Sequence, residues 1–200
     1  MKPEKYYKQI ESKWNDEYPS PRTLDEIWKF YLECGYENPQ RTITSILKQV
    51  PWEMNNILDF GCDNGLMLKF ICDTIPELKG VGIDINSKAI EKAKQDISDL
   101  SFQHFDGIKI PFDDKIFDLL FACAVIKHIR YEDREQIYNE INRVSNYVFF
   151  IETDSKKEEI ETFQSWKFYH SNFDEQFKQH FIPIKVIHEA GDILGLYQCK

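Results

Sequence analysis

The spacing of apolar side chains changes near residue 55 and separates two kinds of pattern. Between residues 4 and 50, apolar positions recur three and four residues apart, as at Ile43, Ile46 and Val50, which predicts two or three helices. From residue 56 onward, short apolar runs alternate with helical stretches. This alternation predicts an α/β domain with a doubly wound, mostly parallel sheet.

The pattern changes again in the last quarter of the chain. The charged segment 154–161 is typical of a solvated helix start, and an aromatic-rich stretch follows it. The apolar runs 182–189 and 193–200 predict a strand pair that closes the sheet in antiparallel fashion. Because no linker is visible, we expect an N-terminal helical cap over residues 1–50 and one globular unit over residues 51–200.

Charge and cysteine content narrow the class of partner. The 200 residues include 25 Lys and Arg against 34 Asp and Glu, a formal charge of −9, which disfavours nucleic acids and anionic membranes as partners. The five cysteines form no Cys-x-x-Cys pair and are typical of reduced thiols. The N-terminus has no apolar core of the signal-peptide type, and no run of 18 apolar residues follows, so we expect a cytoplasmic protein without membrane insertion. These features leave the oligomeric state open.

A glycine loop lies between a predicted buried strand and a predicted apolar helix, in the segment Ile-Leu-Asp-Phe-Gly-Cys-Asp-Asn-Gly at 57–65. Gly61 and Gly65 permit backbone angles closed to other residues, and the helix that follows directs free N–H groups toward a ligand. Asp84 ends the next predicted strand about 20 residues later, where a carboxylate accepts hydrogen bonds from ribose hydroxyls. Loop and carboxylate together predict an adenosine-type ligand.

The glycine spacing departs from the dinucleotide fingerprint Gly-x-Gly-x-x-Gly. Gly61 and Gly65 are four residues apart, and Asp63 occupies the middle position, where a pyrophosphate would meet its carboxylate. This disfavours a nicotinamide dehydrogenase. An acidic loop suits a ligand that carries a cationic or amino group.

Four segments in order resemble the motifs of class I S-adenosylmethionine-dependent methyltransferases. They are the glycine loop, the segment Gly-Ile-Asp-Ile-Asn at 82–86, the region 105–129 and the run 148–154. The match covers about residues 50–155. It implies a Rossmann-like, seven-stranded sheet with an antiparallel C-terminal strand, and S-adenosyl-L-methionine as the cofactor.

The resemblance also implies a set of cofactor-binding residues. The methionine part would be surrounded by Asp59, Gly61, Cys62, Asp63 and Gly65. The nucleoside would be bound by Asp84 at the ribose, Ile85 against the adenine, and Asp106 with Gly107 at the adenine amino edge. Cys123 and Ala124 would lie beneath the sulfonium.

Two histidines are candidate catalytic groups. Methyl transfer is an in-line displacement that depends mainly on alignment, so a base is needed only where the acceptor has a proton to lose. His128 follows the predicted fourth strand, and His170 lies in the aromatic-rich stretch. The alternative for His128 is a structural role in the next turn.

Aromatic side chains are the candidate substrate-binding residues. Phe, Trp and Tyr make up 14% of the chain, and they cluster in the two segments outside the motifs, which favours a hydrophobic acceptor pocket. Plain packing of a cap is the alternative for each one. The candidates are Tyr6, Tyr7 and Trp14 on one side and Trp166, Phe168 and Tyr169 on the other.

Several motifs of other methyltransferases are missing. Cys-Ala-Val-Ile stands at 123–126 in place of an Asn/Asp-Pro-Pro-Tyr/Phe motif, and no metal-ligand cluster is visible, so we expect a metal-independent enzyme. The sequence thus predicts methyl transfer to an O or N atom of a small molecule, of the sugar, glycan-precursor or natural-product type. The alternatives are a protein or RNA methyltransferase and a cofactor-binding but inactive partner subunit.

Overall fold

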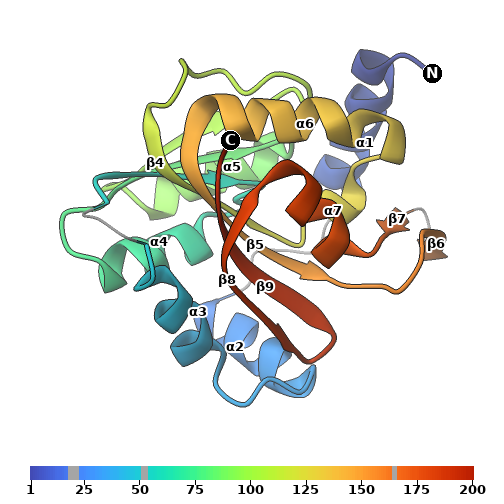
Figure 1. Ribbon diagram of the computed structural model, residues 1–200. Coiled ribbons are helices and arrows are strands. Elements are labelled where there is room, and N and C mark those ends of the chain that lie inside the picture. The colour runs from blue at the N-terminus through green and yellow to red at the C-terminus, as the bar shows by residue number, and fades with distance from the viewer. Residues whose placement is uncertain (18–22, 51–53, 164–165) are drawn as a thin grey trace.

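The computed structural model describes residues 1–17, 23–50, 54–163 and 166–200 (Figure 1). The helices are α1 (Pro3–Glu17), α2 (Leu24–Glu33), α3 (Pro39–Leu47), α4 (Leu66–Thr74), α5 (Ser87–Asp96), η1 (Ile126–His128), α6 (Tyr131–Val144) and α7 (Phe173–His180). The strands are β1 (Asn56–Phe60), β2 (Lys79–Asp84), β3 (Ser101–His104), β4 (Phe117–Cys123), β5 (Ser145–Thr153), β6 (Glu159–Phe163), β7 (Trp166–His170), β8 (Ile182–Glu189) and β9 (Asp192–Gln198).

Seven of these strands form one sheet in the order β3-β2-β1-β4-β5-β9-β8. Strands β1 to β5 pair in parallel, and β9 pairs antiparallel with both β5 and β8. This confirms the predicted doubly wound sheet with a C-terminal antiparallel strand. Parallel order places the carboxyl ends of β1, β2 and β4 along one edge, where ligands bind in open α/β sheets.

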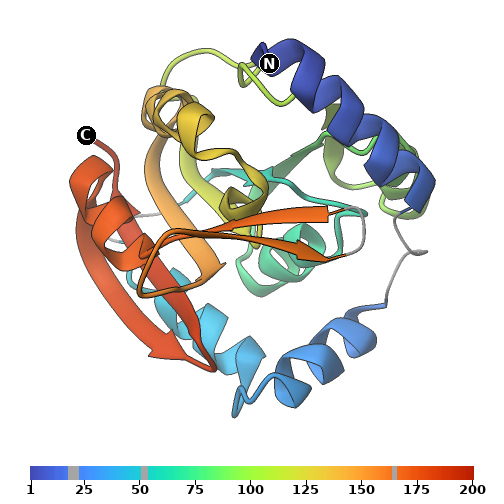
Figure 2. The same ribbon diagram turned by 90° about the vertical axis from the view of Figure 1, so that its right-hand side faces the viewer.

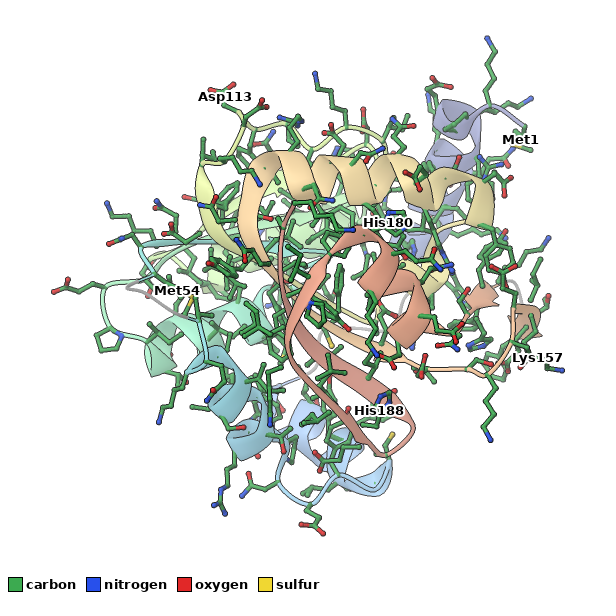
Figure 3. The ribbon with its side chains drawn as sticks, viewed as in Figure 1. Met1, Met54, Asp113, Lys157, His180 and His188 are labelled. Carbon is green, nitrogen blue, oxygen red and sulfur yellow. The ribbon has the colours of Figure 1, made fainter. Side chains whose placement is uncertain are left out.

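The sheet is covered on both faces, which explains why its central strands read as continuous apolar runs. Side chains of α6 and α7 pack on one face, and those of α2, α3, α4 and α5 pack on the other. Figure 3 shows apolar side chains filling these two layers, while charged ones such as Lys157 and Asp113 point outward. Residues of α2 and α3 therefore belong to the core beneath the sheet.

Helix α1 is separate from that layer. It contacts α5 and lies beside the carboxyl edge of the sheet, as Figure 2 shows. Its C-terminal end is fixed to the start of α5, because the Lys88 ammonium donates to the Asn15 carbonyl (2.7 Å) and the Asn86 amide donates to the Trp14 carbonyl (3.4 Å).

A two-stranded hairpin, β6 with β7, stands beside the main sheet. Its first strand replaces the helix start expected at 154–161. All five residues of β6 are exposed, so no burial pattern marks the strand in the sequence, and pairing with β7 determines its conformation. The Tyr131 hydroxyl ties the hairpin to α6, because its single O–H lies within hydrogen-bond distance of the carbonyls of both Glu159 (2.8 Å) and His170 (2.6 Å).

No helix among the described segments is long and apolar enough to cross a bilayer.

Candidate functional site

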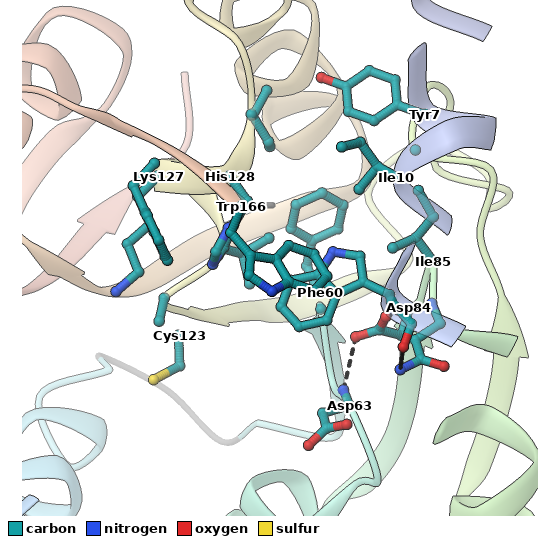
Figure 4. A pocket seen from close by; sticks show the side chains of 18 of the residues that line it. Tyr7, Ile10, Phe60, Asp63, Asp84, Ile85, Cys123, Lys127, His128 and Trp166 are labelled. Carbon is teal, nitrogen blue, oxygen red and sulfur yellow. Dashed lines mark hydrogen bonds between the residues drawn. The ribbon is translucent and has the colours of Figure 1, made fainter. Parts of the chain in front are cut away.

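A cavity of about 640 Å³ opens at the carboxyl edge of the sheet, between α1 and the hairpin (Figure 4). Its size is typical of pockets for small molecules and cofactors. Of the residues proposed from the sequence, those that line it are Tyr7, Trp14, Gly61, Asp63, Asp84, Ile85, Gly107, Cys123, Ala124, His128, Trp166 and Phe168. The motif residues and the two aromatic segments therefore meet at one site.

The loop after β1 is fixed by backbone contacts, and at Gly61 these contacts leave no room for a side chain. The N–H groups of Gly61 and Cys62 both donate to the Ile83 carbonyl, at 2.8 and 3.0 Å. Gly61 has φ +79°, and a Cβ there would lie 2.4 Å from a methyl carbon of Val125. Glycine at this position therefore lets the loop approach the turn after β4.

Asp63 fits this loop in place of a second glycine. Its φ is +49°, a left-handed conformation that aspartate tolerates better than most residues. Its backbone N–H donates to Asp84 Oδ2 at 2.8 Å, which joins the glycine loop directly to the end of β2 (Figure 4).

Asp84 is the central carboxylate of the site. It also accepts a hydrogen bond from the Asn86 N–H at 2.7 Å. Burial raises its pKa, while these N–H donors oppose the rise. Beneath it, burial raises the pKa of Asp59 well above the ordinary value, with smaller contributions from Asp84 and Asp63. Three carboxyl groups gathered here favour a ligand with positive charge.

Apolar groups form the wall beside Asp84. Ile85 follows it in the chain, and the rings of Phe60 and Phe105 meet edge to face at 5.4 Å. Helix α1 closes this part of the cavity at Gly107, where a Cβ would lie 2.8 Å from the Tyr7 ring. The Tyr7 hydroxyl donates to the Asp133 carboxylate at 3.0 Å, which fixes the helix in place.

The other end of the cavity is built around the turn after β4. Ala124 has φ +57°, and its N–H donates to the Ile151 carbonyl at 2.7 Å. The Tyr31 hydroxyl and the Cys123 sulfur share a hydrogen bond at 2.9 Å, and burial raises the pKa of the Cys123 thiol to about 12. Cys123 is therefore a protonated thiol in the neutral pH range.

His128 lies among aromatic rings at this end. Its ring is 5.3 Å from that of Trp14 and 5.0 Å from that of Phe168, and Trp14 contacts Trp166 at 4.3 Å. Burial lowers the pKa of His128 to about 3, with smaller contributions from Lys127 and His170. The imidazole is thus neutral at physiological pH and has a nitrogen lone pair to offer.

His170 and two tyrosines proposed from the sequence do not line the cavity. His170 ends β7, and its Nε2 lies 2.9 Å from Glu161 Oε2, its diagonal neighbour across the hairpin. The hydroxyl of Tyr6 on α1 and the hydroxyl of Tyr169 on β7 share a hydrogen bond at 3.2 Å. The two tyrosines thus join α1 to the hairpin, and His170 joins the two strands of the hairpin.

Four of the proposed cofactor residues, Asp59, Cys62, Gly65 and Asp106, do not line the cavity. Asp59 and Cys62 are buried, and the Cys62 thiol donates to the Asp63 carbonyl at 3.6 Å. Gly65 has φ +79° before α4, and a Cβ there would lie 2.5 Å from the Phe102 ring. Asp106 is exposed and accepts the Ile108 N–H at 2.9 Å, which shapes the turn around Gly107.

The sequence analysis missed nine lining residues: Ile10, Phe30, Phe60, Asn86, Phe105, Val125, Lys127, Ile129 and Phe163. Most of them lie next to a motif residue in the sequence, so the motifs could have indicated them. Phe30 on α2 and Phe163 on β6 carried none, because only the tertiary fold brings them to the cavity.

The residues present fit S-adenosylmethionine. Asp84 suits the ribose hydroxyls, Ile85 and Phe105 suit a flat purine, and the acidic loop suits the cationic methionine part. The buried Asp59 Oδ2 has no hydrogen-bond partner among the described residues, as expected where a charged ligand group belongs nearby. Within the same described segments, no group of three or more His, Cys, Asp or Glu side chains could hold a metal ion.

Fold and site together define a Rossmann-like domain that binds an adenosine-type cofactor. A family model described as "Methyltransferase domain" matches residues 57–146. This match agrees with the resemblance to class I S-adenosylmethionine-dependent methyltransferases that the motifs predicted, and S-adenosylmethionine is the cofactor that the site fits.

Curated relatives are named as methyltransferases of different kinds. An O-methyltransferase of Pyrenophora dematioidea is 27% identical over 140 residues, which cover 60% of this chain and 51% of the relative. A putative 23S rRNA (guanine-N(1)-)-methyltransferase of Bacillus subtilis is 32% identical over 96 residues, which cover 45% and 34%. The chain thus spans about half or less of the length of these relatives.

Solved structures share the fold. The PH0226 protein of Pyrococcus horikoshii aligns with a TM-score of 0.69 and 18% identity, over 98% of this chain and 99% of that one. An O-methyltransferase from a trans-AT polyketide synthase multienzyme of Brevibacillus brevis, in complex with S-adenosyl-L-homocysteine, has a TM-score of 0.55 and 19% identity, over 70% and 53%.

Proposed function

We propose that this protein transfers a methyl group from S-adenosylmethionine to an O or N atom of a small-molecule acceptor, such as a sugar, a glycan precursor or a natural-product intermediate. One observation carries the proposal: the cavity that Asp84 lines is also lined by the aromatic rings of Trp14, Trp166 and Phe168. Aromatic walls of this kind suit the flat or apolar body of a small molecule.

The catalytic contribution of the protein is mainly alignment and exclusion of water. S-adenosylmethionine supplies an electrophilic methyl group on a sulfonium. Asp84 and the glycine loop hold the cofactor, while α1 and the hairpin shield the reacting atoms. With cofactor and acceptor bound, these residues would hold the acceptor lone pair in line with the methyl group, and the neutral His128 imidazole would accept the proton that a hydroxyl acceptor loses.

The alternatives draw less support from the site. The formal charge of −9 opposes an RNA acceptor, although one relative is named as an rRNA methyltransferase. An inactive subunit would bind the cofactor and would transfer no methyl group to any acceptor. We place the activity in the cytoplasm, in keeping with five free cysteines.

Formation of S-adenosylhomocysteine should be measured over a panel of hydroxylated aromatics, sugars, amines, a peptide and an RNA. His128→Ala should lower kcat for a hydroxyl acceptor about 100-fold or more and leave cofactor affinity unchanged. His188→Ala, at an exposed strand position, is the matched control. Cofactor binding without turnover on any acceptor would favour the inactive subunit, and turnover on RNA alone would contradict the small-molecule proposal.

A further inference from the structure

The acceptor half of the cavity contains one cation. Lys127 lines the cavity, and no other Lys or Arg does among the described lining residues. The two lining carboxylates, Asp63 and Asp84, belong to the cofactor half, and Figure 4 shows Lys127 on the opposite side of the cavity from Asp84. The charges of the two halves are therefore opposite in sign.

The Lys127 ammonium has a weak set of protein partners. It donates to the Thr153 hydroxyl at 3.3 Å, and no described carboxylate lies within ion-pair distance of it. The nearby Glu152 already accepts hydrogen bonds from the backbone, because the N–H groups of Val125 and Ile126 both donate to its Oε1 at 2.6 Å. A half-buried ammonium in a cavity, with no carboxylate of the described segments in direct contact, is a site for an anionic group of a ligand.

The walls around this cation are flat and apolar. Trp166 and Phe168 come from the hairpin, and Phe30 and Phe163 extend the wall to the mouth, where their side chains are 49% and 59% exposed. Rings at the mouth of a pocket offer stacking surface to a planar ligand. The charge of Lys127 and the flat apolar walls therefore both indicate a planar ligand with an anionic group.

We propose that the acceptor is a planar aromatic compound that carries one carboxylate, and that Lys127 binds this carboxylate and determines acceptor specificity. The inference rests on the proposed function and names its substrate class. A single negative charge fits better than a phosphate dianion, because the site supplies one ammonium and one hydroxyl and no second cation from the described lining residues.

Binding to the S-adenosylhomocysteine complex tests the proposal without turnover. Two matched pairs serve as probes: 4-hydroxybenzoate with 4-hydroxybenzamide, and 6-hydroxy-2-naphthoate with 6-hydroxy-2-naphthamide. In the wild-type protein the acid of each pair should bind about tenfold tighter than its amide, as measured by calorimetry. Lys127→Met should remove this preference, and Lys127→Arg should keep most of it.

Equal binding of acid and amide, or an acid preference that persists in Lys127→Met, would overturn the proposal. Failure of all four probes to bind would also overturn it, while retained S-adenosylhomocysteine binding would leave the proposed function in place. Lys109→Met, at an exposed position away from the cavity lining, controls for the change in net charge.

Discussion

Glu152 is a buried carboxylate with a structural task at the site. It lies at the end of β5, is 1% exposed, and accepts the backbone N–H groups of the turn that carries Lys127 and His128. Burial raises its pKa from 4.5 to about 7, although Lys127 and these donors act against the rise. The same residue therefore supports the turn and titrates near neutral pH.

This pKa predicts a pH dependence of stability. The folded state holds a proton on Glu152 more tightly than the unfolded state, so its contribution is complete below pH 4.5 and is lost as the pH rises toward 7. The loss amounts to about 3 kcal/mol at most. Urea unfolding at pH 5 and pH 8 should show it in the wild type and not in Glu152→Gln. An equal pH effect in both proteins would refute this assignment.

At the residue scale, the sequence led to residues that line the cavity where their chemistry is local in the chain. Gly61 and Asp84 are recognisable because the turn needs glycine and the strand end needs a carboxylate, whatever the rest of the fold does. Phe30 and Phe163 could not be predicted, because their role depends on the packing of α2 and β6 around the cavity. His170 has a suitable side chain, but its place at the end of β7 pairs it with Glu161.

At the scale of elements, the hairpin depends on a buried arginine for its position. Arg134 on α6 is 2% exposed and donates to the carbonyls of Ile129 and Tyr169 and to the Ser171 hydroxyl. Its guanidinium also lies 4.9 Å from the centre of the Phe173 ring. The side chain thus joins α6 to the end of β7, and through it to the aromatic wall.

Loss of this arginine should destabilise the fold and loosen the hairpin. Arg134→Met leaves buried carbonyl groups without donors and should cost about 3 kcal/mol of unfolding free energy. Arg134→Lys retains one or two of the hydrogen bonds and should cost less. Urea unfolding measures the stability, and hydrogen exchange over 166–170 measures the hairpin. Unchanged exchange in Arg134→Met would contradict this role.

The elements themselves were predicted well where their apolar faces are buried. The strands β1 to β5 and β9 were visible in the sequence because the core requires continuous or alternating apolar runs. The strand β8 was visible from its apolar run alone, since none of its residues is buried. The hairpin was not, because β6 is exposed along its whole length and its pairing with β7 leaves no periodic pattern.

At the scale of the whole molecule, one edge of the sheet collects segments from both ends of the chain. Helix α1 closes one side of the cavity, the hairpin closes the other, and the strand ends form its floor. The acidic end suits the cofactor, and the aromatic end with Lys127 suits the acceptor. The proposed activity therefore depends first on cofactor binding through Asp84.

The most direct measurement is calorimetric titration with S-adenosylmethionine, S-adenosylhomocysteine and NADH. The wild type should bind the first two and not NADH, and Asp84→Ala should lose about 100-fold or more in affinity, because charge-assisted hydrogen bonds to the ribose are removed. Asp113→Ala, an exposed aspartate in the loop between β3 and β4, should bind like the wild type. NADH binding, or unchanged affinity in a folded Asp84→Ala protein, would contradict the account.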